Sequence, residues 1–171
     1  LVNITVIDTI KPLVQAQNLT VYLNAAGLAT ISVEQANNGS SDNCAITNLS
    51  LSKLTFSCID KGINSVILSV KDASNNMSTA IFNVTVLDTL KPIILVNPIV
   101  LLYLDNTGNA TLSNGMVNLG SYDNCNSISL NLSKTSFNGS NLGANQVLLT
   151  VADPSNNQST ATIVVNVIDT V

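Results

Sequence analysis

Residues 65–86 read SVILSVKDASNNMSTAIFNVTV, and they predict the fold more strongly than any other part of the chain. Apolar residues occupy every second position on both sides of a central DASNN turn. They are Val66, Leu68 and Val70 before the turn and Ala80, Phe82, Val84 and Val86 after it. Period-two alternation is typical of strands with one buried face. This stretch therefore predicts two neighbouring strands joined by a tight turn.

The sequence of the chain repeats itself once, and matching segments lie about 80 residues apart. The matching segments are IDTIKP (7–12) with LDTLKP (87–92), SDNC (41–44) with YDNC (122–125), and KDASNN (71–76) with ADPSNN (152–157). We therefore expect two tandem repeats, 9–88 and 89–169. Residues 1–8 are interpreted as the end of a preceding repeat or linker, and residues 170–171 as the start of the next linker.

Alternation and turn residues predict further strands in each repeat. In the first repeat the expected strands are 13–23, 28–34, 46–51, 54–58, 63–71 and 77–87. An extended array must leave each repeat at the end opposite the one where it begins, which requires an odd number of strands. A short extra strand or a crossover between sheets is therefore expected within 51–62. About seven strands with this spacing predict an all-β fold, with two immunoglobulin-like sandwiches arranged end to end.

The composition excludes several classes of function. Of the 171 residues, 46% are hydrophobic, only 9% are charged and none is His or Trp. The six cations are scattered lysines, so no basic patch indicates a nucleic-acid partner. The longest apolar run, 93–104, is too short to cross a membrane and contains Pro98. No set of nucleophile, base and acid recurs in both repeats, so an enzyme is not expected.

Aspartates recur in matching turns of the two repeats. They are Asp8 and Asp88 in the N-terminal linker, Asp42 and Asp123 in the loop after the second strand, and Asp72 and Asp153 in the loop before the last strand. In an immunoglobulin-like sandwich these three places share one end. Carboxylates brought together repel one another unless they are protonated or neutralised by a cation. Oxygen ligands from several loops suit Ca²⁺.

The DASNN and DPSNN turns supply further candidate oxygens at alternate positions. These are Ser74 and Asn76 in the first repeat, and Ser155 and Asn157 in the second. Alternate oxygens in a tight loop can face one ion, as at the start of an EF-hand loop, although the rest of that motif is missing. The alternative interpretation is that Asp and Asn are only favoured turn residues. We predict Ca²⁺ at the N-terminal junction of each repeat, where it would stiffen the array.

The order of DTIKP, GSSDNC, LSKLTFSC, VKDASNN and NVTVLDT along the first repeat, which the second repeat follows in altered form, resembles hyalin-repeat-like immunoglobulin modules. Such modules recur in very large secreted bacterial surface proteins, including adhesins exported by type IX secretion. The resemblance implies a non-catalytic stalk or adhesin spacer, placed outside the cell and either attached to the outer membrane or secreted. Its partners would be neighbouring repeats. The chain departs from the family at Asn75 and Asn156, where glycine is frequent, and at Gly139, where a cysteine is usual.

The resemblance also implies a covalent modification. Bacteria with such arrays glycosylate the threonine of D-T-apolar triplets, which occur here as DTI (8–10), DTL (88–90) and DTV (169–171). The expected O-glycosylation sites are Thr9, Thr89 and Thr170. The alternative is that each threonine caps a linker turn.

The cysteines predict one disulfide. Cys44 and Cys58 enclose a loop for which a disulfide contributes about 3 kcal/mol in the chain-entropy model. The alternative is a pair of buried thiols. In the second repeat Gly139 leaves Cys125 without a partner in its own domain, and we expect Cys125 to be a buried, inert free thiol.

Two other functions stay open at this point. One is a subunit of a self-assembling surface filament or sheath, in which chains associate through a donated strand. The other is an adhesive module for a carbohydrate or a host protein, although only 4% of residues are aromatic. Tyr22 and Tyr103 are expected to be strand residues with packed rings, and Phe56 and Phe137 to belong to the core.

Overall fold

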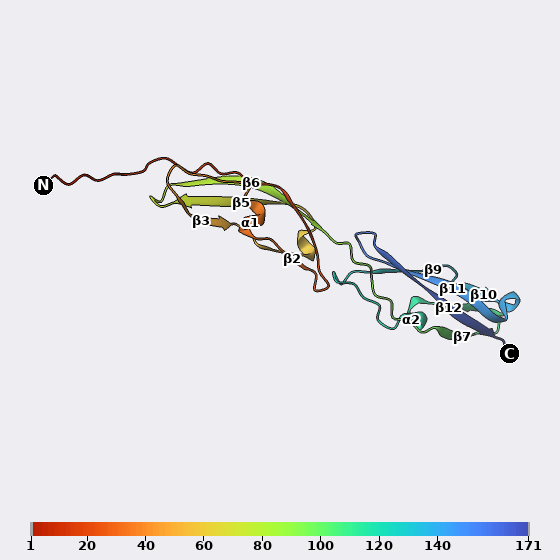
Figure 1. Cartoon of the computed structure of the whole chain (residues 1–171). Coiled ribbons are helices and arrows are strands. Elements are labelled where there is room, and N and C mark those ends of the chain that lie inside the picture. Colours follow the sequence, from red (N-terminus) through yellow and green to blue (C-terminus); the bar gives the residue numbers. More distant parts are fainter. Residues whose placement is uncertain (1, 171) are drawn as a thin grey trace. The chain divides into compact units, whose positions relative to one another are not determined.

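The computed structural model describes residues 2–170. The chain forms two compact units, Leu1–Asp88 and Thr89–Val171. In each unit the regular secondary structure is mostly β-strand and the helices are short (Figure 1), so the predicted all-β class with two tandem sandwich repeats is confirmed. The predictions for residues 1 and 171, which include the last residue of the DTV triplet, lie outside the described residues.

The described residues of unit 1 form six strands. They are β1 (Leu19–Tyr22), β2 (Leu28–Thr30), β3 (Ile46–Leu51), β4 (Thr55–Ser57), β5 (Gly62–Asp72) and β6 (Met77–Leu87). One sheet has the order β1-β6-β5-β3, and the other pairs β2 with β4. β1 runs parallel to β6, whereas the other pairs are antiparallel. Single bridges also join Leu13 to Ser41 and Ala16 to Asn37.

Unit 2 repeats this arrangement. Its strands are β7 (Ile99–Tyr103), β8 (Asn109–Thr111), β9 (Ser129–Leu132), β10 (Ser136–Asn138), β11 (Gly143–Ala152) and β12 (Gln158–Ile168). The larger sheet has the order β7-β12-β11-β9, again with a parallel first pair, and β8 pairs with β10. The internal repeat of the sequence is therefore a repeat of topology.

Two short helices of unit 1, each with a counterpart in unit 2, differ from the strand assignment, and the predicted strand 13–23 is reduced to β1 with single bridges at Leu13 and Ala16. The region 28–34 ends as a strand at Thr30, because Ser32 and Gln35 form a capping box that starts the one-turn helix α1 (Val33–Ala36). Its counterpart in unit 2 is α2 (Asn114–Val117). No extra strand lies within 51–62, but the crossover between sheets expected there is present, because β3 belongs to the four-stranded sheet and β4 pairs with β2. The 3₁₀ helix η1 (Cys58–Asp60), matched by η2 (Gly139–Asn141), follows β4.

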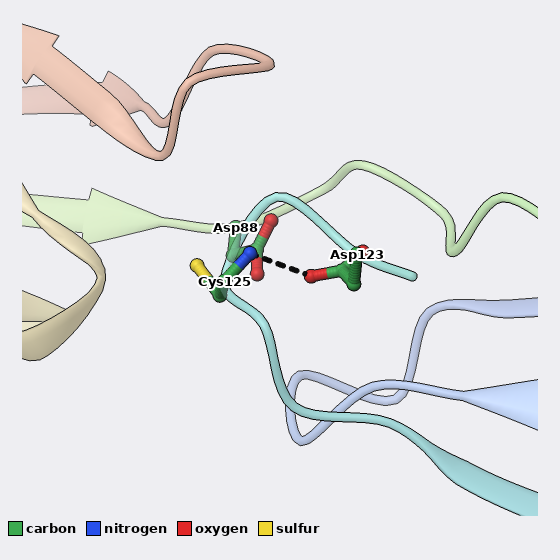
Figure 2. A group of neighbouring side chains, drawn as sticks. All are labelled: Asp88, Asp123 and Cys125. Carbon is green, nitrogen blue, oxygen red and sulfur yellow. Dashed lines mark hydrogen bonds between the residues drawn. The ribbon is translucent and has the colours of Figure 1, made fainter. Parts of the chain in front are cut away.

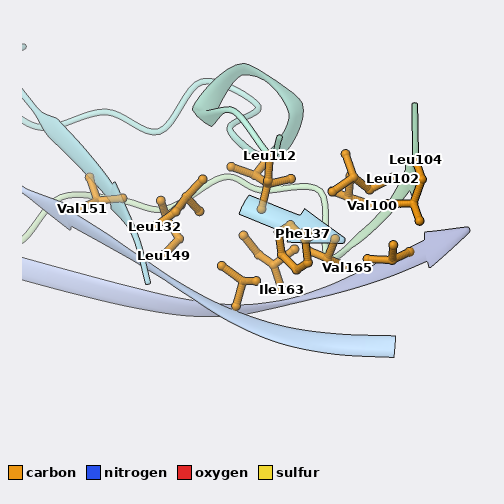
Figure 3. Packing of buried hydrophobic residues seen from close by; sticks show 13 residues of the cluster. Val100, Leu102, Leu104, Leu112, Leu132, Phe137, Leu149, Val151, Ile163 and Val165 are labelled. Atoms are coloured by element: carbon orange, nitrogen blue, oxygen red, sulfur yellow. The ribbon is translucent and has the colours of Figure 1, made fainter. Parts of the chain in front are cut away.

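The predicted alternation accounts for the core of each unit. In unit 1 the buried side chains include Phe56, Val66, Leu68, Val70, Phe82, Val84 and Val86. In unit 2, Figure 3 shows the equivalent cluster, in which Phe137, Leu149, Ile163 and Val165 interdigitate between the sheets. The core positions of Phe56 and Phe137 are confirmed. The packed rings expected for Tyr22 and Tyr103 are wrong, because these side chains are 60% and 54% exposed on the outer face of strands β1 and β7.

The two ends of unit 1 are chemically distinct. At one end, Asp72 closes β5 and leads into the turn before β6. At the other end, β6 runs into Asp88, whose carboxylate lies 3.9 Å from the Lys61 ammonium. Strands of this length span roughly 33 Å. Asp88 therefore lies a strand length away from Asp72, and the chain leaves unit 1 at the opposite end.

Candidate metal centre

Asp8, Asp42 and Asp72 come together at the N-terminal end of unit 1. Each offers a carboxylate oxygen, and these oxygens all lie within 4.8 Å of one another. Asp8 comes from the segment before the sandwich, Asp42 from the loop before β3, and Asp72 from the end of β5. The convergence of three loops that the sequence predicted is therefore present in the geometry of unit 1.

Asp72 is held by the turn that follows it. Its two carboxylate oxygens accept hydrogen bonds from the backbone N–H and the side-chain amide of Asn76, both at 2.7 Å. Asn75 has a φ of 70°, which lets the chain turn back into β6 within four residues. Asn tolerates this left-handed conformation better than most residues, although glycine has no steric cost there. The turn therefore fixes a carboxylate that is only 1% exposed.

Asp8 is tied to its own linker and to the loop at 42–44. One oxygen accepts the Ile10 backbone N–H at 3.0 Å and the Asn43 side-chain amide at 3.3 Å. The Ile10 N–H lowers the pKa of Asp8 most, followed by the Cys44 thiol and the Asn43 amide, while partial burial opposes them. These contacts keep Asp8 ionised at neutral pH.

Two carboxylate oxygens of this group are buried without a hydrogen-bond partner. They are Oδ2 of Asp8 and Oδ1 of Asp42, whose other oxygen accepts the Cys44 backbone N–H at 3.0 Å. A buried, unsatisfied polar atom is costly, and a charged one more so. A divalent cation coordinated by these oxygens would remove both the unsatisfied acceptors and the mutual repulsion. The donor set, made only of hard oxygens, fits Ca²⁺.

The Cys44 thiol lies beside the same carboxylates. Its pKa is raised above the ordinary range by hydrogen bonding to Asp8, then by partial burial and by the negative charges of Asp8, Asp42 and Asp72. The Asn43 amide lies 3.4 Å from its sulfur. Sequence reasoning assigned Cys44 to the domain interior, but it is exposed at this end of the unit.

The predicted Cys44–Cys58 disulfide is wrong. Cys44 is free, whereas Cys58 is disulfide-bonded. Cys44 precedes β3 at the C-terminal end of β5, and Cys58 begins η1 just before the N-terminal end of β5. The roughly 33 Å length of that strand separates them, far beyond the 7 Å that disulfide geometry allows between Cα atoms.

The prediction for Cys125 is also wrong. Cys125 is disulfide-bonded and only partly buried, so it is neither a free thiol nor a core residue. Its backbone N–H donates to the Asp123 carboxylate at 3.0 Å, as the dashed line in Figure 2 shows, which repeats the bond between Cys44 and Asp42. The absence of a cysteine at Gly139 therefore did not leave Cys125 as a free thiol.

The second repeat reproduces part of the acidic arrangement. Asp88 and Asp123 lie close together beside Cys125, as Figure 2 shows, and Oδ1 of Asp123 is buried without a partner. The sulfur of Cys125 is disulfide-bonded, so only the two carboxylates are candidate ligands here. Asp153 is not in this group. Both of its oxygens accept hydrogen bonds within its own turn, from the Ser155 and Asn157 backbones and from the Asn157 amide.

The remaining predicted ligands differ in how exposed they are and in which of their atoms face the carboxylates. Ser74 is exposed and Ser155 is half-buried in the equivalent turn. The amide nitrogen of Asn76 faces Asp72, so Asn76 supports the carboxylates rather than adding an oxygen to them in this conformation. The predicted glycosylation sites Thr9, Thr89 and Thr170 are all exposed, and their modification stays a prediction.

No protein-family model and no curated protein matches the chain. Among solved structures, the two-domain extracellular fragment of human protocadherin-24 is similar, with 13% identity, a TM-score of 0.45 and coverage of 93% of this chain and 98% of that one. A mouse cadherin-23 fragment has 16% identity and a TM-score of 0.40, over 96% and 66%. The protocadherin γB4 extracellular domain has 13% identity and a TM-score of 0.42, and the chain spans only 33% of its length. In the described part of the chain, no helix has the length and apolar character needed to cross a membrane.

Proposed function

We propose that this chain is a non-catalytic structural segment of an extracellular bacterial surface protein, acting as a calcium-stiffened stalk or adhesin spacer. The two buried, unpartnered oxygens of Asp8 and Asp42, beside the Asp72 carboxylate, carry the proposal. The three carboxylates together carry three negative charges, and two of their buried oxygens accept no hydrogen bond. A site of this kind gains most from a divalent cation.

The location of the acids supports a stiffening role. Asp8 belongs to the segment that leads into unit 1, whereas Asp42 and Asp72 belong to the sandwich itself. A cation held by all three would fix the direction in which that segment joins the sandwich. The linker could then no longer pivot freely about the first strand. The second repeat keeps only Asp88 and Asp123 of this arrangement, so the proposal rests on the site of the first repeat.

Calcium binding is tested by calorimetry and thermal unfolding of the full chain, in Ca²⁺, in Mg²⁺ and in EDTA. We expect Ca²⁺ to raise the Tm of unit 1, because a cation that binds only the folded state stabilises it by mass action. Asp42→Asn removes one charge while keeping the shape of the side chain, and it should abolish most of the shift. Glu34→Gln, at an exposed acid of helix α1, is the matched control and should keep the shift.

Equal melting of the unmodified chain in Ca²⁺ and in EDTA would contradict calcium binding. Stiffening needs its own measurement, such as the distribution of distances between one dye on the segment before Asp8 and another on the sandwich of unit 1. A calcium-dependent rise in Tm with an unchanged distance distribution would keep the cation site but reject the stalk mechanism.

A further inference from the structure

Four large apolar side chains are exposed on two neighbouring antiparallel segments of unit 2. Ile93 and Tyr122 exchange two backbone hydrogen bonds of 2.8 and 3.0 Å, and their side chains are 49% and 51% exposed. The Leu119 N–H donates to the Leu95 carbonyl oxygen at 2.8 Å, and these side chains are 66% and 45% exposed. Ile94 packs inward against the core, so Ile93 and Leu95 on either side of it point outward. Side chains at facing positions of such segments lie close together on one face, and we call these four the unit 2 apolar patch.

Unit 1 builds the same arrangement from mostly polar residues. Leu13 and Ser41 exchange the equivalent pair of backbone hydrogen bonds, and the Asn38 N–H donates to the Gln15 carbonyl oxygen at 2.8 Å. The equivalents of Leu95, Leu119 and Tyr122 are therefore Gln15, Asn38 and Ser41, all of them exposed. Because the sandwich forms with polar side chains at these positions, folding does not require the apolar ones of unit 2. Contiguous exposed apolar residues on a folded domain mark an interaction surface.

The charges near the patch favour a second copy of this chain as the partner. The chain has a net charge of −4, and two acidic molecules repel each other unless the surfaces that meet lack exposed acids. Helix α1 of unit 1 carries the exposed Glu34, whereas α2 of unit 2 has Gly115 at the equivalent position. Asp123, which follows Tyr122, is only 3% exposed. A basic partner would be attracted by an acid at position 115, whereas an acidic partner, such as this chain itself, is accommodated by its absence.

We propose that the unit 2 apolar patch binds the same patch of a second copy of this chain, forming a dimer with two-fold symmetry. Exposed apolar patches of this kind measure on the order of several hundred Å². Two copies facing each other would bury roughly 1,000 Å² in total, which is near the lower limit for a specific interface. The dimer is therefore expected to be weak and reversible. It forms through unit 2 and does not depend on the cation site proposed for unit 1.

Sedimentation equilibrium of the full chain from about 1 μM to about 1 mM tests the proposal, in EDTA so that the cation site does not contribute. All samples carry Cys44→Ser, because the free, exposed Cys44 could otherwise cross-link two copies. We expect an equilibrium between monomer and dimer. A triple variant, Leu95→Gln with Leu119→Asn and Tyr122→Ser, gives unit 2 the residues that unit 1 already folds with. It should raise the dissociation constant at least about a hundredfold, because large side chains at the centre of an interface contribute most of the binding energy.

A matched control variant removes exposed apolar side chains from a different surface. Ile63, Met77 and Ile81 are 74%, 55% and 72% exposed on the outer face of β5 and β6 in unit 1. The control, Ile63→Ala with Met77→Gln and Ile81→Thr, introduces the residues that unit 2 has at the equivalent positions, Ala144, Gln158 and Thr162. It should leave the dissociation constant unchanged. A chain that stays monomeric at the highest concentration would overturn the proposal, and so would equal dissociation constants for the two triple variants.

The three tyrosines locate the interface without any change to the patch. Tyr22, Tyr103 and Tyr122 are similarly exposed, at 60%, 54% and 51%, but only Tyr122 belongs to the patch. Hydroxyl-radical labelling is compared between dilute samples and samples in which the dimer predominates. Tyr122 should be labelled at least about threefold more slowly in the dimer, because the centre of an interface excludes water. Tyr22 and Tyr103 should keep their labelling rates, and a dimer with unprotected Tyr122 would overturn the assignment of the surface.

Discussion

Asn76 is hydrogen-bonded to Asp8, 68 positions earlier in the chain, through its side-chain amide and the Asp8 carbonyl oxygen at 3.1 Å. The same amide donates to the Asp72 carboxylate at 2.7 Å. One side chain therefore joins the linker before unit 1 to the turn between its two longest strands. This bond keeps the Asp8 and Asp72 carboxylates at a fixed separation.

Replacing Asn76 with alanine should loosen this connection. The loss of partly buried hydrogen bonds, one of them to a carboxylate, predicts a decrease of about 1–3 kcal/mol in the free energy of unfolding of unit 1. Asn106→Ala, in an exposed turn, is the control and should change stability by less than about 0.5 kcal/mol. Denaturant titration measures both. Similar, small effects of the two variants would show that Asn76 is dispensable.

Neighbouring residues of β5 should differ sharply in their contribution to stability. Leu68 is fully buried and Ile67 is 39% exposed on the opposite face of the strand. Leu68→Ala should therefore cost about 2–5 kcal/mol, because it removes apolar contacts and leaves a cavity. Ile67→Ala should cost clearly less. If thermal unfolding gave equal losses for both variants, the assignment of the two faces would be incorrect.

The stability of unit 1 should depend on pH through Asp60. The Lys53 ammonium, followed by the Ser57 backbone N–H, lowers the pKa of Asp60 below its ordinary value. A carboxyl group with a lowered pKa in the folded state stabilises it above the unfolded pKa, and this contribution is lost as the pH falls through the folded pKa. Asp60→Asn should therefore lower Tm modestly at pH 7, and this difference should shrink as the pH falls through the lowered pKa of Asp60.

The second repeat contains a natural counterpart of this variant, since Asn141 stands where Asp60 stands in the first repeat. Its side chain still accepts the Asn138 backbone N–H at 3.1 Å, as Asp60 accepts that of Ser57. The cap should therefore persist in Asp60→Asn, and only the charge contribution should disappear. A Tm difference that stays constant however far the pH is lowered below the ordinary pKa of aspartate would exclude a charge effect.

Thiol labelling should distinguish the three cysteines. Under non-reducing conditions, a maleimide should label Cys44 alone, because Cys58 and Cys125 are disulfide-bonded. Its raised pKa predicts slower labelling than that of an ordinary exposed thiol, since the thiolate is the reactive form. Mass spectrometry of the peptides locates the label, and Cys44→Ser should remove it. Label on Cys58 in the untreated chain would contradict this assignment.

The sequence predicted the strands and the core well because both depend on local periodicity. Val66, Leu68 and Val70 are buried because a strand places every second residue on one face. The convergence of Asp8, Asp42 and Asp72 was predictable because their loops share one end of the sandwich. Each of these inferences needed only a repeating pattern and a known topology.

The features that the sequence did not predict depend on distances across the fold. Cys44 and Cys58 are close in sequence but lie at opposite ends of β5. Helix α1 is a single turn, too short to leave a helical period. The hydrogen bond between Asn76 and Asp8 joins residues that are far apart in the sequence, and no local sequence pattern predicts such a contact. The only hint of the positive φ of Asn75 was that glycine is frequent at this position in the family that the chain resembles.

The parallel pairing of β1 with β6 has a mechanical consequence. β1 lies near the start of unit 1 and β6 at its end, and their paired residues run from Leu19 with Val84 to Tyr22 with Leu87. Tension applied to the two ends of the unit pulls these strands along their common axis in opposite directions. The hydrogen bonds between them are then loaded in shear and must break together, whereas a hairpin pulled open from one end would lose its bonds singly. The parallel pairing of the first and last strands should therefore make the unit resist stretching.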